Sequence, residues 1–100
     1  MQKNVFNPIQ SAIVPLQGTE ITTADSGWYI AQIDLSPYIP SGAVPIGIET
    51  ISFDGNIIPV LNINTNTGVS YLTLRSPVSK TITSAYRRVM VFYSFVDINS

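Results

Sequence analysis

The chain has 100 residues, which fits one domain, and it contains neither cysteine nor histidine, so no disulfide and no imidazole-based site is available. Charged residues make up only 11% of the chain and the net charge is −1, which excludes the basic stripe of a nucleic-acid-binding protein. The longest apolar run lies near the C-terminus and is far too short to cross a bilayer, so no membrane insertion is expected.

The pattern of breaks and apolar residues predicts an all-β fold. No segment repeats its apolar residues with a helical period, and seven prolines and six glycines divide the chain into short segments. Between these breaks Ile, Val, Thr, Tyr and Phe dominate, which suit pleated surfaces. We predict an antiparallel β-sandwich, jelly-roll-like, with about eight strands. It forms one domain over residues 1–100 and begins with an extended N-terminal arm of about residues 1–10.

The first half of the chain contains the clearest strand. After predicted strands at 11–16 and 20–23 and a turn at 24–27, residues 28–35 alternate with a period of two. One face of that strand is predicted to face the core, and it carries Tyr29, Ala31, Ile33 and Leu35. Residues 36–42 form a corner framed by Pro37 and Pro40.

The apolar parity of strand 44–53 shifts from Ile46 and Ile48 to Ile51 and Phe53, which predicts a β-bulge that the nearby Gly47 would ease. The tripeptide 54–56 (DGN) predicts a hairpin turn into strand 57–64, because glycine tolerates a positive φ. A second turn at 65–68 leads to strand 69–75, and a further strand is predicted at 78–83.

The last predicted strand, 86–97, is apolar on both faces, whereas an antiparallel sandwich usually exposes one face to water. Either the strand is central and covered on both sides, or its second face contacts another subunit. We favour the subunit contact, since so weakly charged a chain must expose apolar surface. The alternative is a monomer surfaced by Ser, Thr, Asn and Gln. The predicted interface of the homo-oligomer comprises Val89, Val91, Phe92, Tyr93 and Phe95.

Catalytic chemistry is not indicated, and we predict a non-enzymatic protein. Without histidine, general acid–base catalysis would need paired carboxylates, and no two acidic residues lie closer than five positions. Asp34 and Glu49 could meet across adjacent strands as glycosidase carboxylates do, but we favour solitary surface charges. No nucleophile elbow, phosphate-binding loop or dinucleotide glycine pattern is present, so no cofactor and no metal are expected.

Ligand binding is better supported, because aromatic rings and amides are the groups that recognise sugars. The candidate ligand-binding residues are Trp28, Tyr38, Asn62, Asn64 and Asn66. Each has a structural alternative: Trp28 could close the end of the sandwich or lie in an interface, Tyr38 could bond the backbone of its corner, and the asparagines could simply form a hairpin turn.

Several segments resemble the tip domains of phage tail fibres and virion fibres. They are 33–42 (IDLSPYIPSG), 45–48 (PIGI), 58–62 (IPVLN) and 88–93 (RVMVFY), and with their surroundings the similarity touches about two-thirds of the chain. The resemblance implies a jelly-roll-like sandwich, a trimer, and binding to a host-surface glycan or protein. It transfers no binding residues. Such fibres carry a long shaft before the tip, which this sequence lacks.

We therefore expect a viral fibre or receptor-binding module, made in the host cytoplasm and located in the virion. The alternative is a structural virion component, such as a capsid decoration, head fibre or baseplate protein, that contacts other virion proteins without binding the host.

Overall fold

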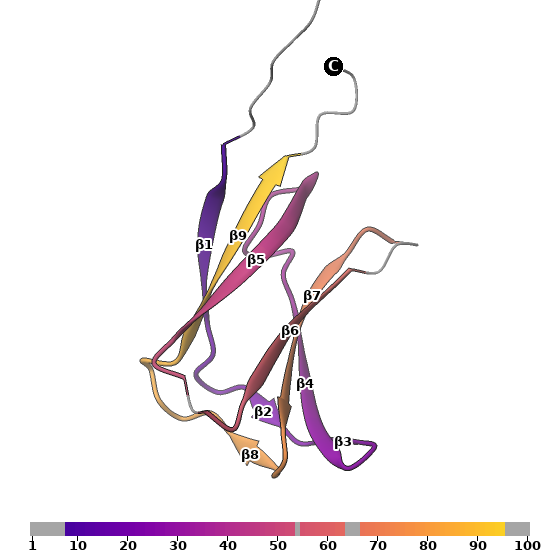
Figure 1. Ribbon diagram of the computed structural model, residues 1–100, viewed down its shortest axis with the longest axis vertical. Helices are drawn as coiled ribbons and strands as arrows, with labels where there is room; N and C mark the ends of the chain where they lie inside the picture. Colours follow the sequence, from indigo (N-terminus) through magenta and orange to yellow (C-terminus); the bar gives the residue numbers. More distant parts are fainter. Residues whose placement is uncertain (1–7, 54, 64–66, 96–100) are drawn as a thin grey trace, which may run out of the picture.

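The computed structural model describes residues 8–53, 55–63 and 67–95. This part of the chain consists of strands joined by turns and loops (Figure 1). The strands are β1 (Gln10–Pro15), β2 (Glu20–Ile21), β3 (Thr23–Asp25), β4 (Trp28–Asp34), β5 (Ala43–Ile51), β6 (Ile58–Ile63), β7 (Ser70–Ser76), β8 (Lys80–Thr81) and β9 (Arg88–Phe95).

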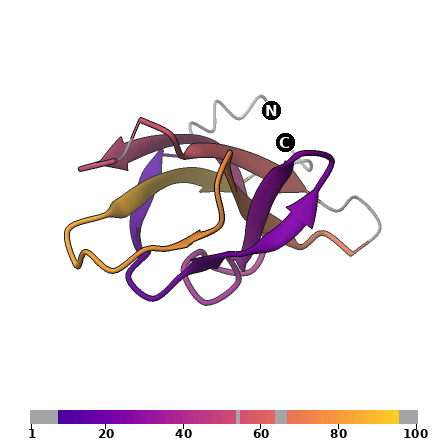
Figure 2. The same ribbon diagram turned by 90° about the horizontal axis from the view of Figure 1, so that it is seen from below.

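Two antiparallel sheets face one another across the core. The three-stranded sheet has the order β1-β9-β5, and the four-stranded sheet has the order β3-β4-β7-β6. The short pair β2-β8 lies at the lower end in Figure 1. Figure 2, seen from below, shows the same arrangement in cross-section. The structure confirms the prediction of an antiparallel β-sandwich.

The core lies between the inner faces of these sheets. Alternation on β4 is as predicted, because Tyr29, Ala31 and Ile33 pack against the core and Leu35, just after the strand, is fully buried. The central strands β9 and β7 contribute most of the rest. The buried apolar residues are Val14, Leu16, Ile21, Leu35, Ile39, Ile57, Leu72, Leu74, Ile82, Val89, Val91 and Tyr93.

Most predicted strands differ from the structure at their ends, and two predicted segments differ more clearly. The turn expected at 24–27 shrinks to Ser26 and Gly27, whose φ angles of 51° and 89° suit a two-residue hairpin of type I′. The residues before it form β3, which raises the number of strands to nine in the part of the chain that the structure describes. The strand predicted at 78–83 is only Lys80–Thr81, because the Ser76 hydroxyl bonds both the N–H and the carbonyl of Val78 and holds a turn there.

The bulge predicted near Gly47 is confirmed. The register of β5 against β9 shifts between Pro45 and Gly47, and Ile46 drops out of the ladder with 53% of its surface exposed. One extra residue on β5 lets Pro45 and Ile48 both point to the core side, opposite Tyr93 and Val91.

The interface prediction is wrong for Val89, Val91 and Tyr93, which are buried within a single chain. Strand β9 is central in its sheet, and the side chains on this face join the core cluster that also contains Leu72 and Leu74 of β7. The Tyr93 hydroxyl donates to Oε1 of Gln10 at 3.3 Å. Phe95 lies at the end of the same face, 37% exposed and edge-on to Tyr93. Phe92 points to the opposite, outer face and is half-buried.

We predict that Leu72→Ala lowers the free energy of unfolding by about 2–5 kcal/mol, because it opens a cavity at a fully buried position of a central strand. Ile58→Ala removes as many carbons from a side chain that is 44% exposed, so its cost should be at most about 1 kcal/mol. Urea unfolding of both variants measures the difference. Equal costs would show that the core is placed incorrectly.

Candidate functional site

The outer face of the four-stranded sheet gathers aromatic, amide and hydroxyl groups. The register places Gln32 beside Thr73 and Val60, and in the next row places Asp34 beside Tyr71 and Asn62. Residues directly opposite one another in such a ladder point to the same side of the sheet. Side chains from three strands, far apart in the sequence, therefore meet on one surface.

Trp28 and Arg75 form one end of this surface. The Arg75 guanidinium lies over the Trp28 ring, 4.7 Å from its centroid, and both side chains are half-buried. A contact of this kind contributes about 0.5–1 kcal/mol at an exposed site and fixes both groups. Because the guanidinium covers one face of the indole, Trp28 is less available for stacking than its sequence position suggested.

A shallow basin of about 540 Å³ lies next to this pair. The Thr73 hydroxyl donates to Oδ1 of Asn62 at 2.7 Å, which leaves the Asn62 amide N–H groups to donate to an outside partner. Tyr71 supplies the aromatic ring and Gln32 a second amide. The lining residues are Asp25, Ile30, Gln32, Asn62, Ile63, Tyr71 and Thr73.

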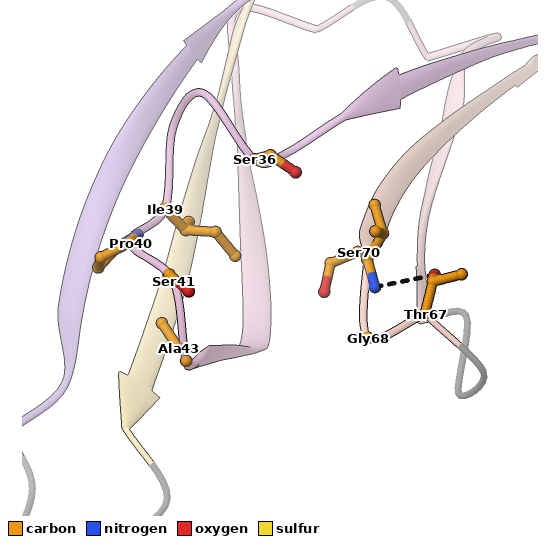
Figure 3. A pocket seen from close by; sticks show the side chains of 10 residues that line it. Ser36, Ile39, Pro40, Ser41, Ala43, Thr67, Gly68 and Ser70 are labelled. Atoms are coloured by element: carbon orange, nitrogen blue, oxygen red, sulfur yellow. Dashed lines mark hydrogen bonds between the residues drawn. The ribbon is translucent and has the colours of Figure 1, made fainter.

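A smaller pocket of about 290 Å³ lies between the proline corner and the start of β7 (Figure 3). Its lining is small and uncharged: Ser36, Ile39, Pro40, Ser41, Gly42, Ala43, Thr67, Gly68, Val69 and Ser70. Many of its backbone groups bond within the fold, as Ala43 N–H does to the Pro40 carbonyl at 3.1 Å and Val69 N–H to the Thr67 hydroxyl at 3.3 Å. The basin therefore offers a ligand more unused donors and a larger aromatic surface.

Asp34 is fixed where β4 enters the corner. Its Oδ1 accepts from the Ser36 N–H at 2.8 Å. The Ser36 side chain and then this backbone bond hold the pKa of Asp34 below its usual value of 3.8. Hydrogen bonds to the charged form have this effect, and they mark Asp34 as a turn-forming carboxylate rather than an acid poised to donate a proton.

The predicted ligand residues are only partly brought together. Trp28 and Asn62 share the outer face of the four-stranded sheet, near its opposite ends. Tyr38 is half-buried and packs against the core, away from that face. Asn64 and Asn66 lie outside the described residues.

Gln32, Tyr71, Thr73 and Arg75 were missed as site residues. The sequence did carry a signal for Tyr71, Thr73 and Arg75, because these residues alternate along the strand with the buried Leu72 and Leu74. Alternation identifies which residues point outward, but only the pairing of β7 with β4 and β6 shows which outward residues are neighbours.

The suggested carboxylate pair does not form, since Asp34 lies on the four-stranded sheet and Glu49 on the outer face of the three-stranded one. Within residues 8–53, 55–63 and 67–95, no group of acidic side chains is arranged to hold a metal ion. The same residues include no helix long and apolar enough to span a membrane.

Comparison with known proteins gives no relative: no family model matches the chain, and neither does any curated protein or solved structure.

We predict that Asp34→Ala destabilises the fold slightly at neutral pH and that the difference disappears in acid. A lowered folded pKa means that the stabilisation is present above the unfolded value of 3.8 and is lost as the pH falls through the lower folded value. Thermal unfolding of both proteins at a series of pH values measures this. A difference that stayed constant down to the lowest pH would show that ionisation of Asp34 is irrelevant.

Proposed function

We propose that this protein is a non-enzymatic glycan-binding module and that its ligand lies on the outer face of the four-stranded sheet. The observation that supports this most directly is the basin in which Tyr71, Gln32 and the Thr73–Asn62 pair are adjacent. An aromatic ring packs against the apolar face of a sugar ring, and amides and hydroxyls bond its hydroxyl groups.

The charge of the basin favours an uncharged saccharide. Asp25 is the charged residue among its lining residues, and a carboxylate accepts hydrogen bonds from sugar hydroxyls but repels an anionic sugar. Arg75, the nearby cation, is engaged with Trp28 at the end of the face. A shallow, open surface is also better suited to a chain of sugars than to a small molecule that must be enclosed.

The resemblance of 33–42, 45–48, 58–62 and 88–93 to fibre tips supports placing this module in a virion, where the glycan would belong to the host surface. The alternative is a structural virion component without host binding. The apolar outer face of the three-stranded sheet favours an assembly role of that kind, and this role does not need the basin.

An immobilised panel of neutral and acidic bacterial surface polysaccharides tests glycan binding. We expect the protein to bind at least one neutral polysaccharide and Tyr71→Ala to weaken that binding about tenfold or more, since about 1.4 kcal/mol corresponds to a factor of ten. Gln32→Ala removes one hydrogen-bonding group and should weaken it about three- to tenfold.

Tyr86→Ala is the matched control, because Tyr86 is 73% exposed and lies in the turn before β9, away from the basin. It should bind like the original protein. Circular dichroism confirms that each variant is folded. Full-strength binding by folded Tyr71→Ala would exclude this face as the site, and a failure to bind any polysaccharide would favour the structural role.

A further inference from the structure

The outer face of the three-stranded sheet is largely apolar. Across β1, β9 and β5 its rows are Ser11–Phe92–Gly47, Ile13–Met90–Glu49 and Pro15–Arg88–Ile51. Ile13 is 40% exposed, and Met90, Phe92 and Ile51 are half-buried. No described strand packs over this face. In an antiparallel sandwich a face that meets water usually carries mostly polar side chains.

Arg88 lies within this apolar surface and has an unmet hydrogen-bonding need. Its Nε is buried and has no hydrogen-bond partner among the described residues. A buried donor without an acceptor costs about 1–3 kcal/mol, so native structures nearly always satisfy it. The neighbouring residues in its row, Pro15 and Ile51, offer no side-chain acceptor.

A carboxylate is present on the same face. Glu49 is exposed on β5 and is paired with Met90 of β9. It is therefore the diagonal neighbour of Arg88, which precedes Met90 by two residues on β9. The face thus carries an apolar strip from Ile13 to Phe92, one cation and one anion. These are complementary to a second copy of the same face.

We propose that two copies of this chain pack face to face through their three-stranded sheets, with Glu49 of each opposite Arg88 of the other. In a two-fold contact both subunits use the same patch, so every contact between them occurs twice. If the two-fold axis passes between Glu49 and Arg88, the Glu49–Arg88 pair therefore forms twice. The carboxylate would pair with the guanidinium charge of Arg88, whose Nε is already covered within its own chain, and the apolar strips would cover each other. This contact does not depend on the glycan proposal.

A second copy fits better than a different partner, because both halves of the charge pair and the apolar strip lie on one surface. The contact also differs from the trimer that the fibre resemblance implies. A three-fold ring joins two different patches of each subunit, whereas this face is complementary to itself.

The first test is the solution mass by size-exclusion chromatography with light scattering. We expect a dimer. Ile13→Glu places a charge in the apolar strip at an exposed position where folding tolerates it, and should give a monomer. Ile58→Glu, a change of the same kind at a similarly exposed position on the other sheet, should leave the dimer intact.

The charge pair is tested by mixing. Glu49→Arg alone and Arg88→Glu alone should each weaken dimerisation at least tenfold, because like charges then face each other. An equimolar mixture of the two variants should associate again, since each now offers what the other lacks. Mixing cannot restore a pair within one chain, so recovery identifies a contact between chains.

A monomer or a trimer in the unmodified protein would overturn the proposal, as would a dimer that survives Ile13→Glu. Failure of the folded charge variants to associate on mixing would exclude the Glu49–Arg88 pairing. Should the protein bind no polysaccharide yet dimerise as described, only the proposed function would fail.

Discussion

The sandwich depends on the packing of its two central strands, β9 and β7. Val89 and Val91 on β9 are fully buried, and so are Leu72 and Leu74 on β7. Each strand is bonded on both edges, so these inner faces tie together β1 and β5 on one side and β4 and β6 on the other. The chain has no disulfide. The small domain is therefore held together by the packing of these four residues with Ile21 and the other buried apolar residues.

Because the inner faces are committed to the core, any function must use the outer faces or the ends, and the two outer faces differ in character. On the four-stranded sheet, β7 alternates buried leucines with Tyr71, Thr73 and Arg75, which makes its outer side polar and aromatic. On the three-stranded sheet, β9 alternates buried valines with Met90 and Phe92, which makes its outer side apolar. One face is suited to a hydroxylated ligand and the other to protein packing.

The fold class could be predicted because alternation and turn residues are local signals. Period-two alternation identified the inner face of β4, and the parity change between Ile48 and Ile51 indicated a bulge in β5, although the residue outside the ladder is Ile46. The inward face of the last strand could not be predicted, because both faces are apolar and only the opposite sheet distinguishes Val91 from Phe92. The basin was also missed, since Gln32 and Tyr71 are separated by a long stretch of chain and become neighbours through strand pairing.

The positions of the two outer faces constrain how binding and assembly can combine. Two chains joined through their three-stranded sheets would stack four layers, with the four-stranded sheets outermost and their basins facing in opposite directions. Two basins that face apart cannot both contact one flat surface. Dimerisation would therefore give no gain in avidity for a single membrane or wall. It would instead let one pair bridge two glycan-bearing surfaces, or bind one surface while the other basin contacts a neighbouring component. Association would also stabilise each chain by mass action, which is of most value to a domain with so small a core.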